Sequence, residues 1–352
     1  MRPCGDFSKY RATWHRNAEW RCQIERLRVQ SRLFPSNRLI GRSHVLITAS
    51  EAQPSRPIFG GLDYLRVVAV VLVTIQHAAA ILGFKAWMTW EGVNVGQVGV
   101  AIFLAISGFL ASQSRQPAWP WFVQRLRRIY PALWIVMAIC FWLTWLSGYK
   151  EFDAYQVISQ MLGLGFFTHP DHLVNTATWF ISLLLVCYAG VFVARLFKAP
   201  RLIGVASSLG LLACAFWVSE PSFVVHVLTF SVAFVASELV PGARVSKTLM
   251  ATGSLAVVCG IIQPLFVGAG ISLIAVGVAL RVATVPRFIR VIAEVSYEYY
   301  LLHGVFLVGV LRFFPGPLAF KLLVALASAV AAAKCLQLFI QRIESWLGRQ
   351  SV

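Results

Sequence analysis

Long apolar runs separated by short polar segments fill the chain from residue 62 almost to its end. A helix that crosses a membrane needs about 20 mostly apolar residues. We expect ten such spans, at residues 62–83, 93–113, 129–148, 178–197, 202–219, 222–240, 247–266, 268–285, 291–311 and 318–340. The pattern predicts an all-α fold, a polytopic integral membrane bundle of about ten transmembrane helices.

The composition agrees with this pattern. Of the 352 residues, 58% are hydrophobic and only 13% are charged, whereas a soluble domain carries about 25% charged residues. The seven cysteines are scattered without a CxxC pair, so we predict neither a disulfide framework nor a zinc site. The run His169-Pro170-Asp171-His172 contains two possible ligands on either side of a turn. We interpret it as a solvated turn and predict no bound metal.

The net charge of +17 is distributed unevenly. Basic residues are concentrated in alternate loops, whereas the loops between them hold most of the acidic residues. This asymmetry is how membrane proteins fix their orientation, with basic loops inside. It predicts that both termini are cytoplasmic, and it makes a nucleic-acid partner an unnecessary explanation of the charge. The basic loops are residues 114–128, 195–201, 241–247 and 281–290.

The ends of the chain differ from its middle. Residues 1–57 hold 11 Lys or Arg and 4 Asp or Glu, and they show no sustained period. We expect a poorly ordered basic cytoplasmic tail there, or an artefact of the assigned start. Residues 58–341 form the predicted membrane domain, and residues 342–352 a short cytoplasmic C-terminal tail.

The first span carries the most informative polar side chains. Arg66 and His77 are eleven residues apart, which brings them to within about 20° of the same helix face and about 16 Å apart along the axis. Asp63 precedes Arg66 by three residues, close enough for an ion pair. Ionisable groups inside a span are costly and indicate function. The alternatives are that Asp63 and Arg66 merely anchor a helix end, and that His77 is a structural histidine bonded to a neighbouring helix.

Two further segments are candidates for binding a substrate. Ser107-Gly108 ends the second span, where small residues permit the close approach of a ligand or of another backbone. No GxSxG elbow surrounds Ser107, so it is a poor candidate nucleophile. Arg125 and Arg128, with Arg127 beside them, lie one turn apart if the segment is helical. Their guanidinium forks suit phosphate groups, although the same residues suit positive-inside anchoring.

The ninth predicted span begins with another polar cluster. Ser296, either Tyr299 or Tyr300, and His303 share a helix face, which predicts a second buried imidazole. A structural hydrogen bond is the alternative. Trp179 opens the fourth span, where it is equally suited to anchor the helix at the membrane interface or to contact a substrate.

Together and in this order, these segments resemble the acyltransferase 3 family of bacterial membrane acyltransferases. The similarity extends over about residues 58–341. It rests on the opening of the first span with its arginine and histidine, the Ser-Gly-Phe end of the second, an Arg-x-x-Arg followed by proline, a Trp-Phe opening and a late Ser-Tyr…Tyr-Leu-x-His motif. In this sequence these are Leu62, Asp63, Leu65, Arg66 and His77; Phe103 to Phe109; Arg125, Arg128 and Pro131; Trp179 and Phe180; and Ser296, Tyr297, Tyr300, Leu301 and His303.

The resemblance implies an acyltransferase of the bacterial inner membrane. It would move an acyl group, most often acetyl, from cytoplasmic acyl-CoA to a hydroxyl of a cell-surface or exported glycan or of a lipid-linked sugar. Acyl-CoA is then a co-substrate, and no tightly bound cofactor is expected. Arg125, Arg127 and Arg128, with Ser107 and Gly108, would hold the donor. The catalytic set would be His77 as general base with Arg66, Asp63 and His303.

Three further site residues and two alternative functions remain. Trp179, Ser296 and Tyr300 would contact the acceptor or support the catalytic groups. Intramembrane arginine and histidine in a ten-span bundle also suit a secondary transporter or flippase, although we find no inverted repeat. A non-catalytic scaffold is a third alternative, in which the alignment of Arg66 with His77 is coincidental.

Overall fold

The structure is a computed structural model. It describes residues 59–91, 93–148, 151–204, 206, 221–240 and 242–350. The predicted tail at residues 1–57 and most of the predicted span at residues 202–219 lie outside these residues.

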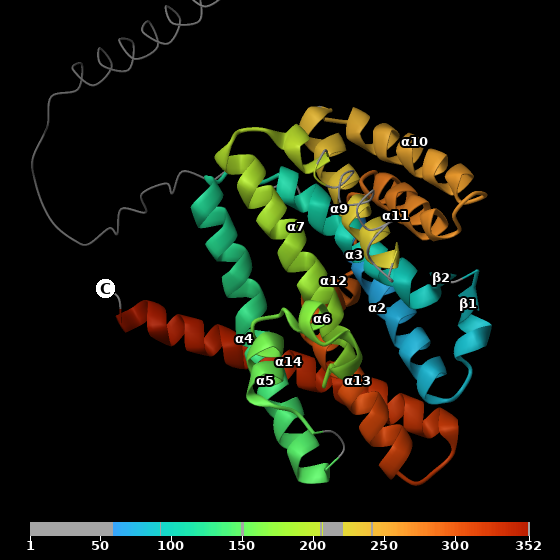
Figure 1. Ribbon diagram of the computed structural model, residues 1–352, viewed down its shortest axis with the longest axis vertical. Helices are drawn as coiled ribbons and strands as arrows, with labels where there is room; N and C mark the ends of the chain where they lie inside the picture. Colours follow the sequence, from blue (N-terminus) through green and yellow to red (C-terminus); the bar gives the residue numbers. More distant parts are fainter. Residues whose placement is uncertain are drawn as a thin grey trace, which may run out of the picture. The chain divides into compact units, whose positions relative to one another are not determined.

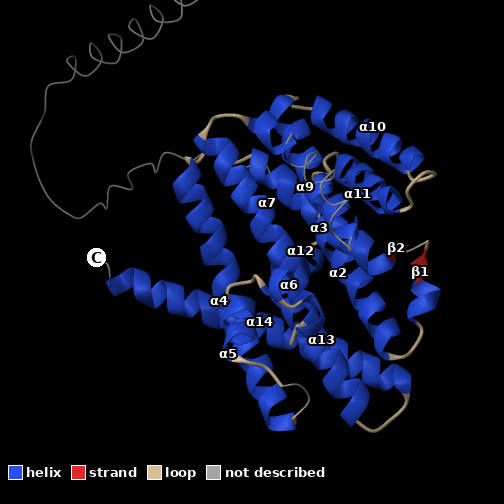
Figure 2. Ribbon diagram, viewed as in Figure 1, coloured by secondary structure: helices blue, strands red, loops and turns tan. Residues whose placement is uncertain are grey.

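The described part of the chain is built from helices, as the apolar pattern predicts (Figure 1). The only strands in it are two residues each, β1 (Thr89–Trp90) and β2 (Val93–Asn94), which pair antiparallel and appear at one edge in Figure 2. The long helices are α2 (Gly60–Ile81), α3 (Val95–Ser112), α4 (Ala118–Ser147), α7 (Trp179–Leu196), α9 (Pro221–Leu239), α10 (Arg244–Cys259), α11 (Leu265–Ala279), α13 (Ser296–Phe313) and α14 (Leu318–Gln350). The short ones are η2 (Lys85–Met88), α5 (Ala154–Met161), α6 (Gly165–Thr168), η3 (Pro170–His172), η4 (Thr176–Thr178) and α12 (Arg287–Glu294).

Helix length and hydropathy identify an integral membrane protein. Among the described residues, six helices are long and apolar enough to cross a membrane, or seven if α12 and α13, which meet at 69°, form one span. The predicted division near residue 267 is confirmed, because α10 and α11 are separate helices. They contain 16 and 15 residues, fewer than the roughly 20 that a straight crossing needs. The count of ten spans therefore stays a prediction.

The third span differs from its predicted form. We expected a loop up to residue 128, but α4 is one helix of 30 residues from Ala118. Pro131 lies inside it and removes one intrahelical hydrogen bond, the one to the carbonyl of Arg127. The helix nevertheless continues on both sides of Pro131, and its buried residues contribute to the larger hydrophobic core. The prediction of a loop at residues 118–128 is therefore wrong, and Arg125 and Arg128 lie one helical turn apart.

Small residues set the spacing of the helices around α3. Asn94 caps this helix through a reciprocal pair of hydrogen bonds with Gln97. A Cβ at Gly99 would overlap the backbone of Ala69 on α2, and one at Gly108 would overlap the carbonyl of Phe230 on α9. Glycine at these positions lets three helix backbones approach closely, as is common between membrane helices. Of the two alternatives at Gly108, a ligand or another backbone, the structure shows the approach of a backbone.

Candidate active site

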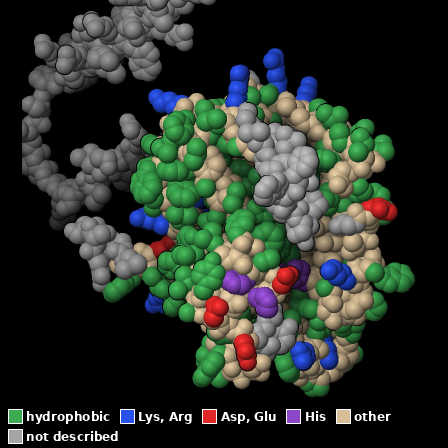
Figure 3. Space-filling model, viewed as in Figure 1, with side chains coloured by type: hydrophobic (Ala, Val, Ile, Leu, Met, Phe, Trp, Pro, Cys, Tyr) green, Lys and Arg blue, Asp and Glu red, His purple; other side chains and the backbone are tan. Residues whose placement is uncertain are grey.

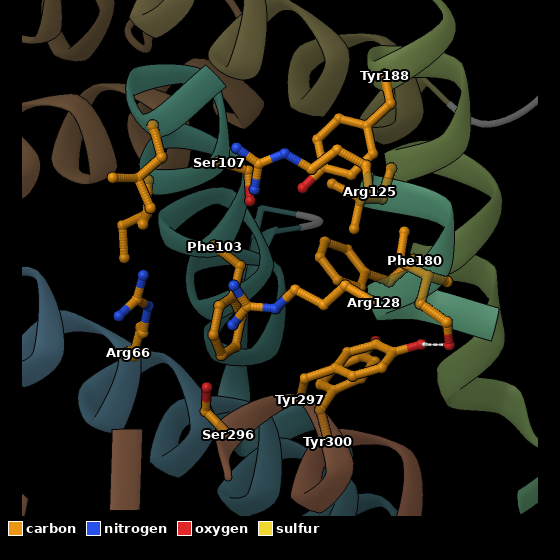
Figure 4. A pocket seen from close by; sticks show the side chains of 14 residues that line it. Arg66, Phe103, Ser107, Arg125, Arg128, Phe180, Tyr188, Ser296, Tyr297 and Tyr300 are labelled. Carbon is orange, nitrogen blue, oxygen red and sulfur yellow. Dashed lines mark hydrogen bonds between the residues drawn. The ribbon is translucent and has the colours of Figure 1, made fainter. Parts of the chain in front are cut away.

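A cavity of about 90 Å³ lies between α2, α3, α4, α7 and α13. Three arginines line it: Arg66 from α2, and Arg125 and Arg128 from α4. Figure 4 shows their guanidinium groups turned toward the same space. Its other polar wall residues are Ser107, Tyr188, Ser296, Tyr297 and Tyr300, and its apolar ones include Phe103, Ile106 and Phe180.

The cavity carries an excess of positive charge. Arg66 forms the predicted ion pair with Asp63, with Nη1 and Oδ1 2.6 Å apart. Neither Arg125 nor Arg128 forms a salt bridge with a carboxylate among the described residues, although Arg128 has a longer-range electrostatic interaction with Glu298. The Arg125 guanidinium lies over the rings of Trp121 and Tyr188, at 5.5 and 5.6 Å from their centroids. Aromatic rings in this arrangement position a cation without neutralising it. The site therefore suits an anionic ligand such as a phosphate group, which the planar guanidinium groups can bind through two hydrogen bonds each.

Two imidazoles meet beyond this cavity. His77 of α2 and His303 of α13 have ring centroids 4.9 Å apart, at an interplanar angle of 66°. The Nδ1 atom of His303 lies 2.6 Å from the carbonyl oxygen of Tyr300. Because a carbonyl only accepts hydrogen bonds, this nitrogen carries the proton and Nε2 presents a lone pair. Nε2 is buried and has no partner among the described residues, so it is free to accept a proton.

Hydrogen bonds between the same two helices hold this pair of histidines. The Thr74 hydroxyl donates to the Val70 carbonyl at 2.8 Å, so its contact of 3.2 Å with the Tyr299 hydroxyl uses the tyrosine as donor. The Tyr299 ring stacks on His303, with centroids 5.9 Å apart. Thr74 lies one turn before His77 on α2. The bond from α13 to Thr74 therefore fixes the distance between the two imidazoles.

A family model described as an acyltransferase domain matches residues 59–336. The chain belongs to the acyltransferase 3 family. It is 30% identical over 152 residues to a protein named O-acetyl transferase from Shigella phage Sf6. That match covers 38% of this chain and 46% of the relative, so the aligned part is less than half of the relative. No solved structure matches the chain.

In this acyltransferase-family chain, the predicted site residues form two groups, and three others lie outside them; Asp63 belongs with the first group through its ion pair with Arg66. Arg66, Ser107, Arg125, Arg128, Ser296 and Tyr300 line the cavity, whereas His77 and His303 form the pair beyond it. Arg127 is exposed and is not among the lining residues. Gly108 faces α9, and Trp179 stacks on His226 with centroids 5.8 Å apart. The late motif thus contributes to both the cavity and the histidine pair. Tyr300 lines the cavity, and its backbone carbonyl accepts the hydrogen bond from His303.

Arg195 is a residue whose role the sequence does not reveal. We counted it among the basic residues of an inside loop, but its guanidinium donates to three carbonyls at the end of α3 and just after it. The distances are 2.8 Å to Gln116, 2.7 Å to Ala111 and 2.9 Å to Ser114. Its guanidinium also lies 5.0 Å from the ring centroid of Trp121. Arg195 therefore fixes the turn into α4, and with it the start of the helix that carries the cavity arginines.

His226 is a second residue that the sequence analysis missed. It lies on α9, is 5% exposed, and has both ring nitrogens buried without a hydrogen-bond partner among the described residues. A histidine in an apolar run gives no periodic signal of its own, and only the fold brings it against Trp179.

Proposed function

We propose that this protein is a membrane-bound O-acyltransferase that moves an acyl group, acetyl in the first instance, from cytoplasmic acyl-CoA to a hydroxyl of a cell-surface or exported glycan. The observation that carries the proposal is the contact between His77 and His303 in a chain of the acyltransferase 3 family. The name of the phage relative, O-acetyl transferase, supports an oxygen acceptor and a two-carbon group. The family match also favours this function over a transporter or a scaffold.

The proposed reaction needs one base. The acceptor hydroxyl attacks the thioester carbonyl, and its proton passes to His77, acting as general base. The ester C–O bond forms as the C–S bond breaks, and the protonated His77 gives its proton to the departing thiolate, which releases CoA as the free thiol and restores the neutral imidazole. The bare Nε2 of His303, beside His77, would accept a proton or orient the His77 ring. A low-dielectric surrounding favours the neutral imidazole that a base requires.

The donor would bind in the cavity with the three arginines. CoA carries several phosphate groups, and Arg125 and Arg128 form no salt bridge with a carboxylate among the described residues. Arg66 lies nearly two turns after the start of α2, whereas His77 lies near its end. A donor whose phosphates lie near Arg66 would therefore direct its thioester along α2 toward His77.

The direct test is acyl transfer by the purified protein. Reconstituted in sealed vesicles with acetyl-CoA, it is expected to consume the thioester without an ion gradient. Cells that contain the gene are expected to carry acetyl esters on a surface glycan, detected by mass spectrometry, that are absent when the gene is removed. A strict requirement for a gradient would favour the transporter, and identical glycans in the two strains would contradict the proposal.

We also propose the ten-span topology, with both termini in the cytoplasm and the protein in the bacterial inner membrane. The charge distribution along the sequence supports it, since Lys and Arg are concentrated in alternate loops. Figure 3 shows Lys and Arg side chains along the upper rim of this face, and histidines, acidic residues and further Lys and Arg side chains lower down. In a cysteine-free background, a Lys85→Cys variant is expected to react with a membrane-impermeant maleimide in spheroplasts, which lack an outer membrane. A Lys198→Cys variant is expected to react only after lysis. The reverse pattern would invert the topology.

A further inference from the structure

Three aromatic rings lie together in the wall of the arginine-lined cavity, and one of them contacts His303. Phe103 of α3, Phe180 of α7 and Tyr300 of α13 all line the cavity. Their centroids are 6.1 Å apart for Phe103 and Phe180, 6.2 Å for Phe103 and Tyr300, and 5.2 Å for Phe180 and Tyr300. On its other side, the Tyr300 ring lies 5.6 Å from the ring of His303. A thioester in the cavity therefore meets this aromatic cluster before it meets an imidazole.

Two of the three rings are fixed. The Tyr300 hydroxyl donates to the Ala177 carbonyl at 2.9 Å, and Tyr300 is only 2% exposed. Asn175 holds that segment in place, since its side chain donates to the Leu301 carbonyl at 2.9 Å and accepts from the Ala177 amide. Phe180 is 5% exposed. Tyr300 and Phe180 thus form a fixed side of the cavity at the end near His303.

Phe103 is the partly exposed member of the cluster. Its helix cannot move away, because α3 is held against α2 where Gly99 meets the backbone of Ala69, one turn earlier. The space available to a group at this end of the cavity therefore depends on the Phe103 ring itself, which can only rotate about its own side-chain bonds.

We propose that Phe103 determines which acyl group the enzyme accepts, by leaving room beside Phe180 and Tyr300 for a two-carbon group and excluding longer chains. This inference rests on the proposed function and specifies its donor as a short-chain acyl-CoA. A pocket wall distinguishes chains that differ by one methylene by about ten- to two-hundredfold. We expect the ring of Phe103 to weaken binding by a factor of this size for each carbon added to the acyl chain.

The test uses CoA thioethers, which cannot react and need no acceptor. Purified protein is equilibrated with labelled CoA, which is displaced by S-ethyl-CoA or S-butyl-CoA, and the ratio of the two dissociation constants is measured. For the native protein, S-ethyl-CoA is expected to bind at least about a hundredfold more tightly than S-butyl-CoA, which has two more carbons. The Phe103→Ala variant is expected to bring the ratio close to one. Because a ratio does not depend on the fraction of folded protein, a loss of stability cannot imitate this result.

A matched control separates this effect from the loss of any buried ring. Phe141 is 8% exposed and packs on Phe152, away from the cavity lining, so Phe141→Ala should keep the native ratio. If the native protein binds CoA but shows no preference between the thioethers, or if Phe103→Ala leaves the preference unchanged, the role of Phe103 is wrong while the proposed function stands. If CoA does not bind at all, both proposals fail.

Discussion

Replacement of His77 by alanine is expected to lower acyl transfer by about 10²–10⁴-fold, the usual contribution of a general base. We assign the base to His77 rather than to His303 because His77 lies on α2, the helix that also carries Arg66 and Asp63. Without the imidazole, the reaction lacks the group that is proposed to take the proton of the acceptor hydroxyl. The measurement is transfer of labelled acetyl from acetyl-CoA in reconstituted vesicles, at saturating donor.

The control is an exposed histidine of the same chain. His172 lies in η3 on the surface, and His172→Ala is expected to keep native transfer. His77→Ala should still insert into the membrane and bind CoA, because His77 does not line the cavity. Native transfer rates in a well-folded His77→Ala protein would remove this residue from the mechanism and leave His303 as the remaining candidate base.

Local spacing explains which parts of the site were predictable. The ion pair between Asp63 and Arg66 follows from a separation of three residues on a helix, and the structure confirms it. The inward faces of Arg125 and Arg128 follow in the same way once their segment is helical. In both cases the two residues lie on one helix, so their spacing in the sequence determines their relative positions.

Contacts between helices were not predictable in this way. Nothing in the spacing of His77 and His303 shows that α2 and α13 bring their rings to 4.9 Å, because helix pairing is not encoded in a one-dimensional period. The helical start of α4 was missed because Arg125, Arg127 and Arg128 interrupt the apolar run of the helix and suggest a loop. We expected Arg195 to be one of the charged residues of an inside loop, because a hydrogen bond from a guanidinium to a backbone carbonyl leaves no pattern in the sequence.

The second large effect is expected at the donor site. Loss of both Arg125 and Arg128 by substitution with leucine should raise the KM for acetyl-CoA at least tenfold to a hundredfold, because a hydrogen bond to a charged group contributes about 1.5–3 kcal/mol. The value of kcat should change much less, since these residues act on the phosphates rather than on the reacting carbonyl. Initial rates at a series of acetyl-CoA concentrations separate the two constants.

A truncated donor makes this prediction specific. S-Acetyl-N-acetylcysteamine carries the thioester without any phosphate, so the native protein and the double variant should use it at equal, low efficiency. Arg115→Leu removes an exposed charge that is not among the cavity residues, and it should leave the KM for acetyl-CoA unchanged. If the double variant were equally impaired with the truncated donor, the arginines would be maintaining the bundle rather than binding phosphate. The excess positive charge of the cavity would then require another explanation, since no carboxylate forms a salt bridge with either arginine in the described part of the chain.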